Sequence, residues 1–481
     1  MKVGVSNLRL KFAGAPSLQF EDLSLHVKES EKILFLGPSG CGKSTLLQVL
    51  AGLIPNAVPV PMKADDMVIC ESTGVVFQDP DAQFCMPYVD EEIAFVLENR
   101  AVPQHEMNDL IQYYLDKVGL SFQDPHVEIS TLSQGMKQRL AISSMIALEP
   151  EVIFLDEPTA LLDPEGTSEI WSTIKQIEAK QTMIIVEHKI DEVVDFVDRI
   201  VLFNSEGKII ADSDPNTVFS FYKHKIREFG IWYPEVWDEH MKETNLPKDI
   251  VRGQEVLSVT NLKGYRGKHP KIQAPEISVC EGEWVAITGK NGAGKSSLLL
   301  SLMNVMKTSG EIKVSNQLIK TVHDARSQLA YVFQNPEFQF ITNSVYEELA
   351  YSLEMINDPH VDEKVNGWLT SYQLEHVKLL HPYQLSTGQK RRLSVGTALF
   401  GSQPVFLLDE PTFGQDAQNT FKLLHLFEEL RAKGMIIIMV THDEKIVNNY
   451  ATRQWIIEEG LLVSDRNLER VGEGKAYAMD S

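Results

Sequence analysis

One sequence pattern occurs twice in this chain and constrains its architecture more than any other feature. The stretches 37–45 and 289–297 both read G-x-x-x-x-G-K-S, the pattern of a phosphate-binding loop. Four further motifs recur in the same order, about 250 residues apart. These pairs are Gln78 and Gln334, Ser133 and Ser386, Asp156 and Asp409, and His188 and His442. Five ordered motifs repeated at one period indicate a tandem duplication of a nucleotide-hydrolysing domain.

The length of the chain agrees with two domains. Its 481 residues exceed what one hydrophobic core usually organises. We predict a first domain at 1–228, a linker at 229–253 and a second domain at 254–481. The linker contains several aromatic residues, among them Tyr233 and Trp237, so we expect it to pack on a domain surface instead of forming a flexible tether.

Both halves show the local context that a phosphate loop requires. A strand-like alternation comes first, then an apolar strand that leads into the loop, and then a helical segment. Strands alternating with helices predict an α/β fold, in which each domain has a mainly parallel sheet with flanking helices. The segments are 3–12, 32–36 and 44–53 in the first half, and 255–262, 284–288 and 296–303 in the second.

Charge and hydropathy exclude some classes of partner. The net charge of −22 argues against nucleic acid, because binding to a phosphate backbone requires a basic surface. No apolar run reaches 18 residues, so we expect contact with a membrane only through partner proteins. The four cysteines have neither metal-ligand nor disulfide-framework spacing, which is typical of a reducing cytosol.

The two phosphate loops predict ATP binding. Their backbone N–H groups point toward the phosphates at the start of a helix, and Lys43 and Lys295 add a positive charge. Ser44 and Ser296 are placed to ligate Mg²⁺ through their hydroxyls. The predicted loop residues are Gly37, Pro38, Ser39, Gly40, Cys41, Gly42, Lys43, Ser44 and Thr45, and Gly289, Lys290, Asn291, Gly292, Ala293, Gly294, Lys295, Ser296 and Ser297.

Two carboxylates follow an apolar strand in each half. We predict that Asp156 and Asp409 associate with Mg²⁺, directly or through its water. The next residue, Glu157 or Glu410, is suited to polarise the attacking water as general base. The alternative interpretation is a pair of solvated acids at a strand end.

The segments 132–136 and 385–389, which read LSQGM and LSTGQ, resemble the signature sequence of ABC-type ATPases. The resemblance covers nearly the whole chain. It implies two ABC ATPase domains, each with an antiparallel β subdomain at its N-terminal end and a helical subdomain that carries the signature. It also implies that the two halves pair head to tail, with each ATP held between one phosphate loop and the other half's signature. The signature residues implied in nucleotide binding are Ser133, Gly135, Ser386, Gly388 and Gln389.

The resemblance implies roles for further residues in pairs. Gln78 and Gln334 resemble the glutamine that senses Mg²⁺ and the attacking water. His188 and His442 resemble the switch histidine that contacts the γ-phosphate. Asp163 and Asp416 resemble the loop that signals between the two sites. Phe12 and Tyr265 are placed to stack on adenine, or they are ordinary strand aromatics.

The two signatures are unequal. LSTGQ is close to the family pattern LSGGQ, whereas LSQGM departs from it at Gln134 and Met136. We interpret both ATP sites as competent, because the serine and the second glycine are present in both. The site that combines Lys295 with the first signature is nevertheless expected to turn over differently.

A longer motif, F-Q-[DN]-P-[DE]-x-Q-F at 77–84 and 333–340, is similar to the ATPases of energy-coupling factor (ECF) transporters. In that group the segment forms a groove for a helix of the transmembrane T component, and a separate S component captures a vitamin, a vitamin precursor or a transition-metal ion. We predict that Phe84 and Phe340 anchor such a helix, with core packing as the alternative. The implied protein is an importer ATPase on the cytoplasmic face of the cell membrane.

Two other classes of protein also have ATP-binding domains without a membrane span. A twin-ATPase translation factor of the ABC-F type also has two domains on one chain, but it has a long charged linker and lacks the groove motif. A scaffold that binds ATP without hydrolysing it usually lacks a catalytic acid or histidine, and Glu157, Glu410, His188 and His442 are all present here.

Overall fold

The computed structural model describes residues 2–15, 17–38, 40–160, 162, 164–177, 181–244, 246, 253–355, 357–399 and 403–468, so Ser39 and Asp163 lie outside the described residues. The chain divides into two compact units, Met1–Val236 and Trp237–Ser481. This division falls within the segment expected to be the linker.

Unit 1 contains two sheets. The larger has six strands in the order β10-β9-β3-β8-β7-β6, and all neighbours are parallel except β10 and β9. In the smaller, β2, β4 and β5 pair with β1, all antiparallel. The strands are β1 (Val3–Leu10), β2 (Phe20–Val27), β3 (Lys32–Leu36), β4 (Met62–Lys63), β5 (Asp66–Val68), β6 (Thr73–Val76), β7 (Val152–Asp156), β8 (Thr182–Val186), β9 (Arg199–Phe203) and β10 (Ile209–Ser213).

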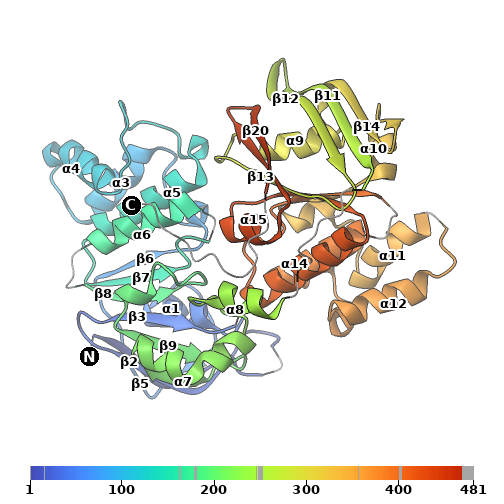
Figure 1. The fold of residues 1–481 in the computed structure, drawn as a ribbon. Coiled ribbons are helices and arrows are strands. Elements are labelled where there is room, and N and C mark those ends of the chain that lie inside the picture. The colour runs from blue at the N-terminus through green and yellow to red at the C-terminus, as the bar shows by residue number, and fades with distance from the viewer. Residues whose placement is uncertain are drawn as a thin grey trace. The chain divides into compact units, whose positions relative to one another are not determined.

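The helices of unit 1 separate by position. In Figure 1, α3, α4 and α5 gather at one end of the unit and the antiparallel strands β2 and β5 lie at the other. The helices are α1 (Lys43–Leu50), α2 (Leu53–Asn56), α3 (Val89–Asn99), α4 (Gln104–Lys117), α5 (Gln134–Ala147), α6 (Pro164–Gln176), α7 (Pro215–Glu228) and α8 (Val236–Glu243), which begins at the last residue of the unit. Short 3-10 turns are η1 (Pro80–Ala82), η2 (Ile129–Thr131) and η3 (Val194–Phe196).

Unit 2 has one continuous ten-stranded sheet in the order β15-β14-β11-β12-β20-β19-β13-β18-β17-β16. The five strands from β19 to β16 are parallel, and the pairing of Gln273 with Leu461 joins the antiparallel part to them. The strands are β11 (Glu255–Arg266), β12 (His269–Cys280), β13 (Trp284–Thr288), β14 (Lys307–Val314), β15 (Gln317–Leu318), β16 (Leu329–Val332), β17 (Val405–Asp409), β18 (Ile436–Val440), β19 (Arg453–Glu458) and β20 (Leu461–Asn467).

The helices of unit 2 follow the same plan. Figure 1 shows α11 and α12 at one end of the unit and β11, β12 and β14 at the other. The helices are α9 (Lys295–Leu302), α10 (Val322–Gln328), α11 (Val345–Met355), α12 (Val361–Ser371), α13 (Thr387–Ala398), α14 (Ala417–Ala432) and α15 (Glu444–Tyr450), and the 3-10 turns are η4 (Pro336–Gln339), η5 (Glu375–Val377) and η6 (Pro382–Gln384).

The central parallel strands are buried along their whole length and consist mainly of apolar residues. All five residues of β7, β8, β17 and β18 are buried, as expected for parallel strands covered by helices on both faces. In such sheets, functional residues follow the carboxyl ends of the strands. None of the helices in the described ranges combines the length and apolarity needed to cross a membrane.

The aromatic residues around the division between the units are packed. Tyr233 is buried in unit 1. In unit 2, the ring of Trp237 meets that of Phe421 edge to face at 5.0 Å, and His240 stacks on Phe421 at 3.8 Å. His240 Nε2 also lies 2.7 Å from the hydroxyl of Tyr450. The segment therefore packs on both sides of the division, as its composition predicted.

Candidate functional site

Each phosphate loop connects a buried strand to a helix through a glycine in the left-handed region. Gly42 and Gly294 precede α1 and α9 with φ of 103° and 111°. A Cβ atom at Gly42 would come within 2.7 Å of the Gln19 side chain, so both conformation and space require glycine there. The first amides of both helices thus face the loop, where they suit an anion.

The loop lysine is held by the loop itself in both units. Lys43 Nζ donates to the carbonyl oxygens of Gly37 at 2.8 Å and Pro38 at 3.0 Å. Lys295 Nζ makes the same two bonds, at 2.8 and 3.0 Å, to Gly289 and Lys290. Both side chains are buried. Each ammonium group is therefore held in place by the main chain of its own phosphate loop.

The loop serine contacts the strand-end aspartate in both units. Ser44 Oγ donates to Asp156 Oδ1 at 2.7 Å, and Ser296 Oγ donates to Asp409 Oδ1 at 3.0 Å. Burial raises the pKa of both aspartates, although these hydrogen bonds oppose the rise. A hydroxyl beside a carboxylate is an all-oxygen set, which fits Mg²⁺. The residues that meet here are those that the sequence predicted as metal ligands, and that role stays a prediction.

The predicted general base of unit 1 contacts two predicted partners. Gln78 Nε2 donates to Glu157 Oε2 at 2.9 Å, and His188 Nε2 lies 2.9 Å from Glu157 Oε1. Burial by itself raises the pKa of Glu157, but the hydrogen bond and charge of His188 and the charge of Lys43 outweigh it, so this pKa lies below its usual value. The carboxylate is thus ionised, as a general base must be.

Unit 2 repeats only part of this arrangement. His442 Nε2 lies 3.2 Å from Glu410 Oε1. Within the described ranges, the side chain of Gln334 donates no hydrogen bond to Glu410, so the glutamine contact of unit 1 has no counterpart. Both glutamates have a left-handed backbone, with φ of 49° at Glu157 and 47° at Glu410. Such strained conformations in non-glycine residues are concentrated at functional sites.

The two signatures differ in how their helices are capped. Ser133 caps α5 by accepting from Met136 N at 3.3 Å. Ser386 caps α13 in the same way, and Gln389 Oε1 in addition accepts from Ser386 N at 2.9 Å, which completes a capping box. Methionine has no oxygen to make that second bond. The departure of LSQGM from the family pattern therefore loosens the start of α5.

The predicted adenine-stacking residues lie in comparable places. Phe12 follows β1 and is half exposed. Tyr265 lies in β11, and its hydroxyl is 3.2 Å from Ser309 Oγ. Stacking on adenine stays a prediction for both.

The prediction that Phe340 anchors a membrane partner is wrong. Its side chain is 8% exposed and packs in a core with Val345 and Leu349. Phe338 and the following Ile341 are instead the exposed large apolar residues here, at 75% and 66%. Phe338 lies within the 3-10 turn η4, whereas Phe340 follows the turn with an extended backbone, so the two side chains are placed by different local conformations.

Sequence reasoning missed one buried acid beside the switch histidine. Glu187 bonds to the hydroxyl of Thr159 and accepts from the backbone N of His188 at 2.9 Å. Burial raises the pKa of Glu187 to about 7, against these hydrogen bonds. One difference between the halves could have pointed to it. A glutamate precedes His188 in the first half, whereas Thr441 precedes His442 in the second.

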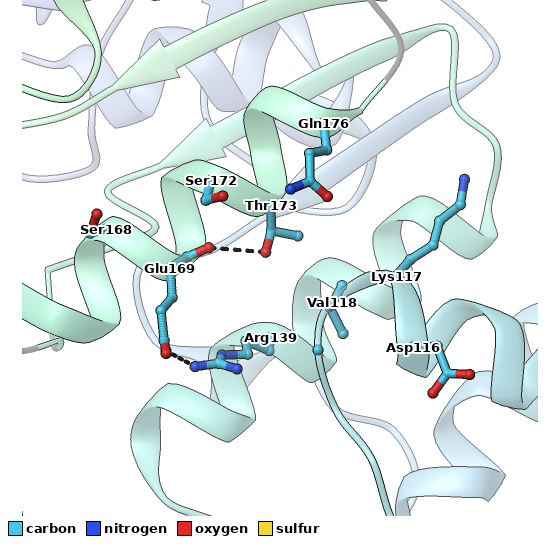
Figure 2. Close-up of a pocket in the computed structure, with 10 residues that line it drawn as sticks. Asp116, Lys117, Val118, Arg139, Ser168, Glu169, Ser172, Thr173 and Gln176 are labelled. Atoms are coloured by element: carbon cyan, nitrogen blue, oxygen red, sulfur yellow. Dashed lines mark hydrogen bonds and ion pairs between the residues drawn. The ribbon is translucent and has the colours of Figure 1, made fainter.

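A separate polar cleft of about 400 Å³ lies among α4, α5 and α6. Figure 2 shows Arg139 of α5 paired with Glu169 of α6, and the main-chain oxygen of Glu169 accepts from Thr173 Oγ1 at 3.0 Å. Its lining includes none of the predicted nucleotide-binding residues. No cluster of three or more potential metal ligands of the His, Cys, Asp and Glu types occurs in the part of the chain that the structure describes.

A family model described as "ABC transporter" matches the chain twice, at residues 20–160 and 272–413. The chain belongs to the ABC transporter family. Its two domains bind ATP, and the chain is an ATPase whose activity is coupled to transport.

Curated relatives of this ABC transporter ATPase align along nearly its whole length. The Bacillus subtilis (strain 168) protein named "Putative HMP/thiamine import ATP-binding protein YkoD" is 35% identical over 93% of this chain and 88% of its own. A Methanosarcina acetivorans protein named "Putative ABC transporter ATP-binding protein" is 30% identical over 96% of this chain and 85% of its own. The solved structure of an RNase-L inhibitor superposes with a TM-score of 0.62, over 97% of this chain and 90% of that one, and at 19% identity it supports the fold alone.

Proposed function

We propose that this chain is the ATP-hydrolysing subunit of an ECF-type importer, attached to the cytoplasmic face of the cell membrane through its partners. The observation that carries the proposal is the contact of Gln78 and His188 with Glu157 in unit 1. Unit 2 repeats it in part, with His442 beside Glu410. Each of these sites adjoins a glutamine loop. The glutamine loop is the segment 77–84 in unit 1 and the segment 333–340 in unit 2. Similarity to a protein named for HMP/thiamine import supports the importer function.

In the proposed mechanism each ATP is held between one unit's phosphate loop and the other unit's signature. Lys43 and Lys295 would bind the β- and γ-phosphates, and Ser386 and Ser133 would contact the γ-phosphate from the other half. Ser44 with Asp156, and Ser296 with Asp409, would hold Mg²⁺, which would neutralise phosphate charge when bound.

The hydrolytic step is assigned to the glutamates. The ionised carboxylate of Glu157 accepts a proton from the attacking water, and His188 and Gln78 hold this carboxylate in place. Glu410 and His442 have the same roles in unit 2. Binding of ATP closes the halves and hydrolysis reopens them, which is a hinge-type motion that a membrane partner can use.

The glutamine loop of unit 2 and the residue after it present an apolar surface that suits the proposed T component. Phe338 in the loop and Ile341 after it are exposed, and Tyr351 and Met355, one turn apart on α11, are exposed as well. A helix with an apolar face is the partner chemistry that fits such a surface. The S component would select the cargo, and we propose a vitamin precursor of the HMP/thiamine type on the name of the relative, with other vitamins and transition-metal ions as the broader class.

The alternative is a soluble translation factor. It is favoured only by the names of structural neighbours, an RNase-L inhibitor and an archaeal ribosome recycling factor, at 19% identity. Identity at that level concerns the fold and carries no function.

Uptake measurements test the proposed function. The chain is expressed with the membrane components encoded beside it, and ATP-dependent uptake of labelled thiamine, HMP and metal ions is measured. We expect ATP-dependent uptake by the wild type, and we expect the double variant Lys43→Ala, Lys295→Ala to abolish it. Lack of uptake of all cargoes, together with ATPase activity stimulated by ribosomes, would contradict it.

A further inference from the structure

A buried arginine joins the signature helix and the glutamine loop of unit 2. Arg391, on α13, is 3% exposed, and its guanidinium donates to the main-chain oxygens of Phe333 at 2.7 Å and Gln334 at 2.5 Å. Burial lowers the pKa of Arg391 to about 10, while the charges of Asp409 and Glu410 oppose that shift. The group is therefore charged at neutral pH, and charged donors make stronger hydrogen bonds than neutral ones.

Two further links accompany this one in unit 2. Lys390 Nζ lies 2.6 Å from Glu337 Oε1, and Gln339 Nε2 donates to the main-chain oxygen of Ser394 at 2.8 Å. All three links run from α13 to the glutamine loop.

Unit 1 repeats the two accompanying links. Lys137 Nζ lies 2.6 Å from Asp81 Oδ1, and Gln83 Nε2 donates to the main-chain oxygen of Ala141 at 3.2 Å. These residues occupy the positions of the pairs in unit 2, so the two accompanying links are a shared feature of both halves.

Among the residues that the structure describes, the arginine link is present in unit 2 alone. Gln138 stands where unit 2 has Arg391, and it is buried to the same extent. Its Nε2 atom has no hydrogen-bond partner among the residues that the structure describes. A glutamine is too short to bridge to two carbonyls as a guanidinium does, so the glutamine loop of unit 1 has one anchor fewer.

We propose that Arg391 is a positioning residue that makes the glutamine loop and the signature helix of unit 2 move as one body. The inference rests on the proposed head-to-tail pairing, in which Gln334 serves the ATP on Lys295 and Ser386 serves the ATP on Lys43. Arg391 then couples the two ATP sites through unit 2. The corresponding coupling through unit 1 is weaker, because Gln138 does not make this link.

Exchange of the two residues gives a matched test. Arg391→Gln installs the residue of unit 1, and Gln138→Arg is the reciprocal control. Hydrogen exchange is measured by mass spectrometry on the full chain, with and without ATP, in a Glu157→Gln, Glu410→Gln background that retains nucleotide. In the parent protein we expect peptides from the unit 2 glutamine loop and from the start of α13 to gain protection together.

Arg391→Gln is expected to separate these responses. The start of α13 still gains protection with ATP, whereas the gain in the glutamine loop falls about 10-fold, because the loop loses its two main-chain bonds to the guanidinium and opens locally more often. In the otherwise wild-type chain, kcat falls about 10-fold with KM unchanged, since positioning acts on the chemical step. Gln138→Arg is expected to increase the protection from hydrogen exchange that the unit 1 glutamine loop and the start of α5 gain together with ATP.

Three outcomes would overturn the inference. The first is joint protection that persists in Arg391→Gln. The second is loss of protection throughout unit 2 without ATP, which would mean that Arg391 only stabilises the fold. The third is that ATP protects neither signature helix of the parent protein from hydrogen exchange. Of the three outcomes, this one alone would also contradict the proposed function.

Discussion

At the scale of single residues, the chemistry depends on a glutamate whose charge its neighbours maintain. Glu157 has a left-handed backbone and a pKa lowered by His188 and Lys43 against burial. We expect Glu157→Gln and Glu410→Gln to leave ATP binding intact and to slow hydrolysis at their own sites by about 10²–10⁴-fold, as loss of a general base does. Single-turnover kinetics measure this, and a double variant with a near wild-type rate would contradict the assignment.

A second prediction at this scale concerns Glu187. Its pKa is about 7 in the folded protein, and its ordinary value is 4.5. Between these values the folded state holds a proton that the unfolded chain has lost, so the free energy of unfolding falls as pH rises through this range. The melting temperature of the wild type should therefore drop more than that of Glu187→Gln between pH 4.5 and 7. Parallel melting curves for the two proteins would refute the prediction.

At the scale of elements, the segment around the turn η4 exposes Phe338 and buries Phe340. We expect Phe338→Ala with Ile341→Ala to abolish binding to the membrane partner with little change in stability, since interface anchors contribute about 2 kcal/mol or more each. Phe340→Ala is the matched control, because a core phenylalanine costs about 3–5 kcal/mol of stability when truncated. Thermal melts and co-purification measure both, and an unchanged complex with the double variant would exclude this surface.

The elements of the fold were predictable to different degrees. The strands β3 and β13 have the predicted bounds because each is a short apolar run that ends at a glycine of a phosphate loop. The contact of Ser44 with Asp156 followed from the motifs, since Ser44 begins the helix after β3 and Asp156 ends β7 in the same parallel sheet. The orientation of Phe340 was missed because it depends on a 3-10 turn. The bonds of Arg391 were missed because main-chain carbonyls leave no trace in a sequence.

At the scale of the whole molecule, the two halves are similar but unequal. The signature of unit 2 has a capping box that unit 1 lacks, so the site that pairs Lys43 with Ser386 is the better organised in the proposed arrangement. We expect Lys43→Ala to reduce transport more than Lys295→Ala. Initial uptake rates compare them, and equal defects, or a larger defect from Lys295→Ala, would count against unequal sites.

The central claim is that one chain contains two ATP sites, each built from both of its halves. The direct measurement is the amount of ATP retained by the Glu157→Gln, Glu410→Gln protein, together with its mass in solution by light scattering. The account predicts two ATP molecules per monomeric chain, reduced to one when Lys43→Ala is added. Retention of ATP only by a dimer of chains would contradict it, because the halves would then pair between molecules.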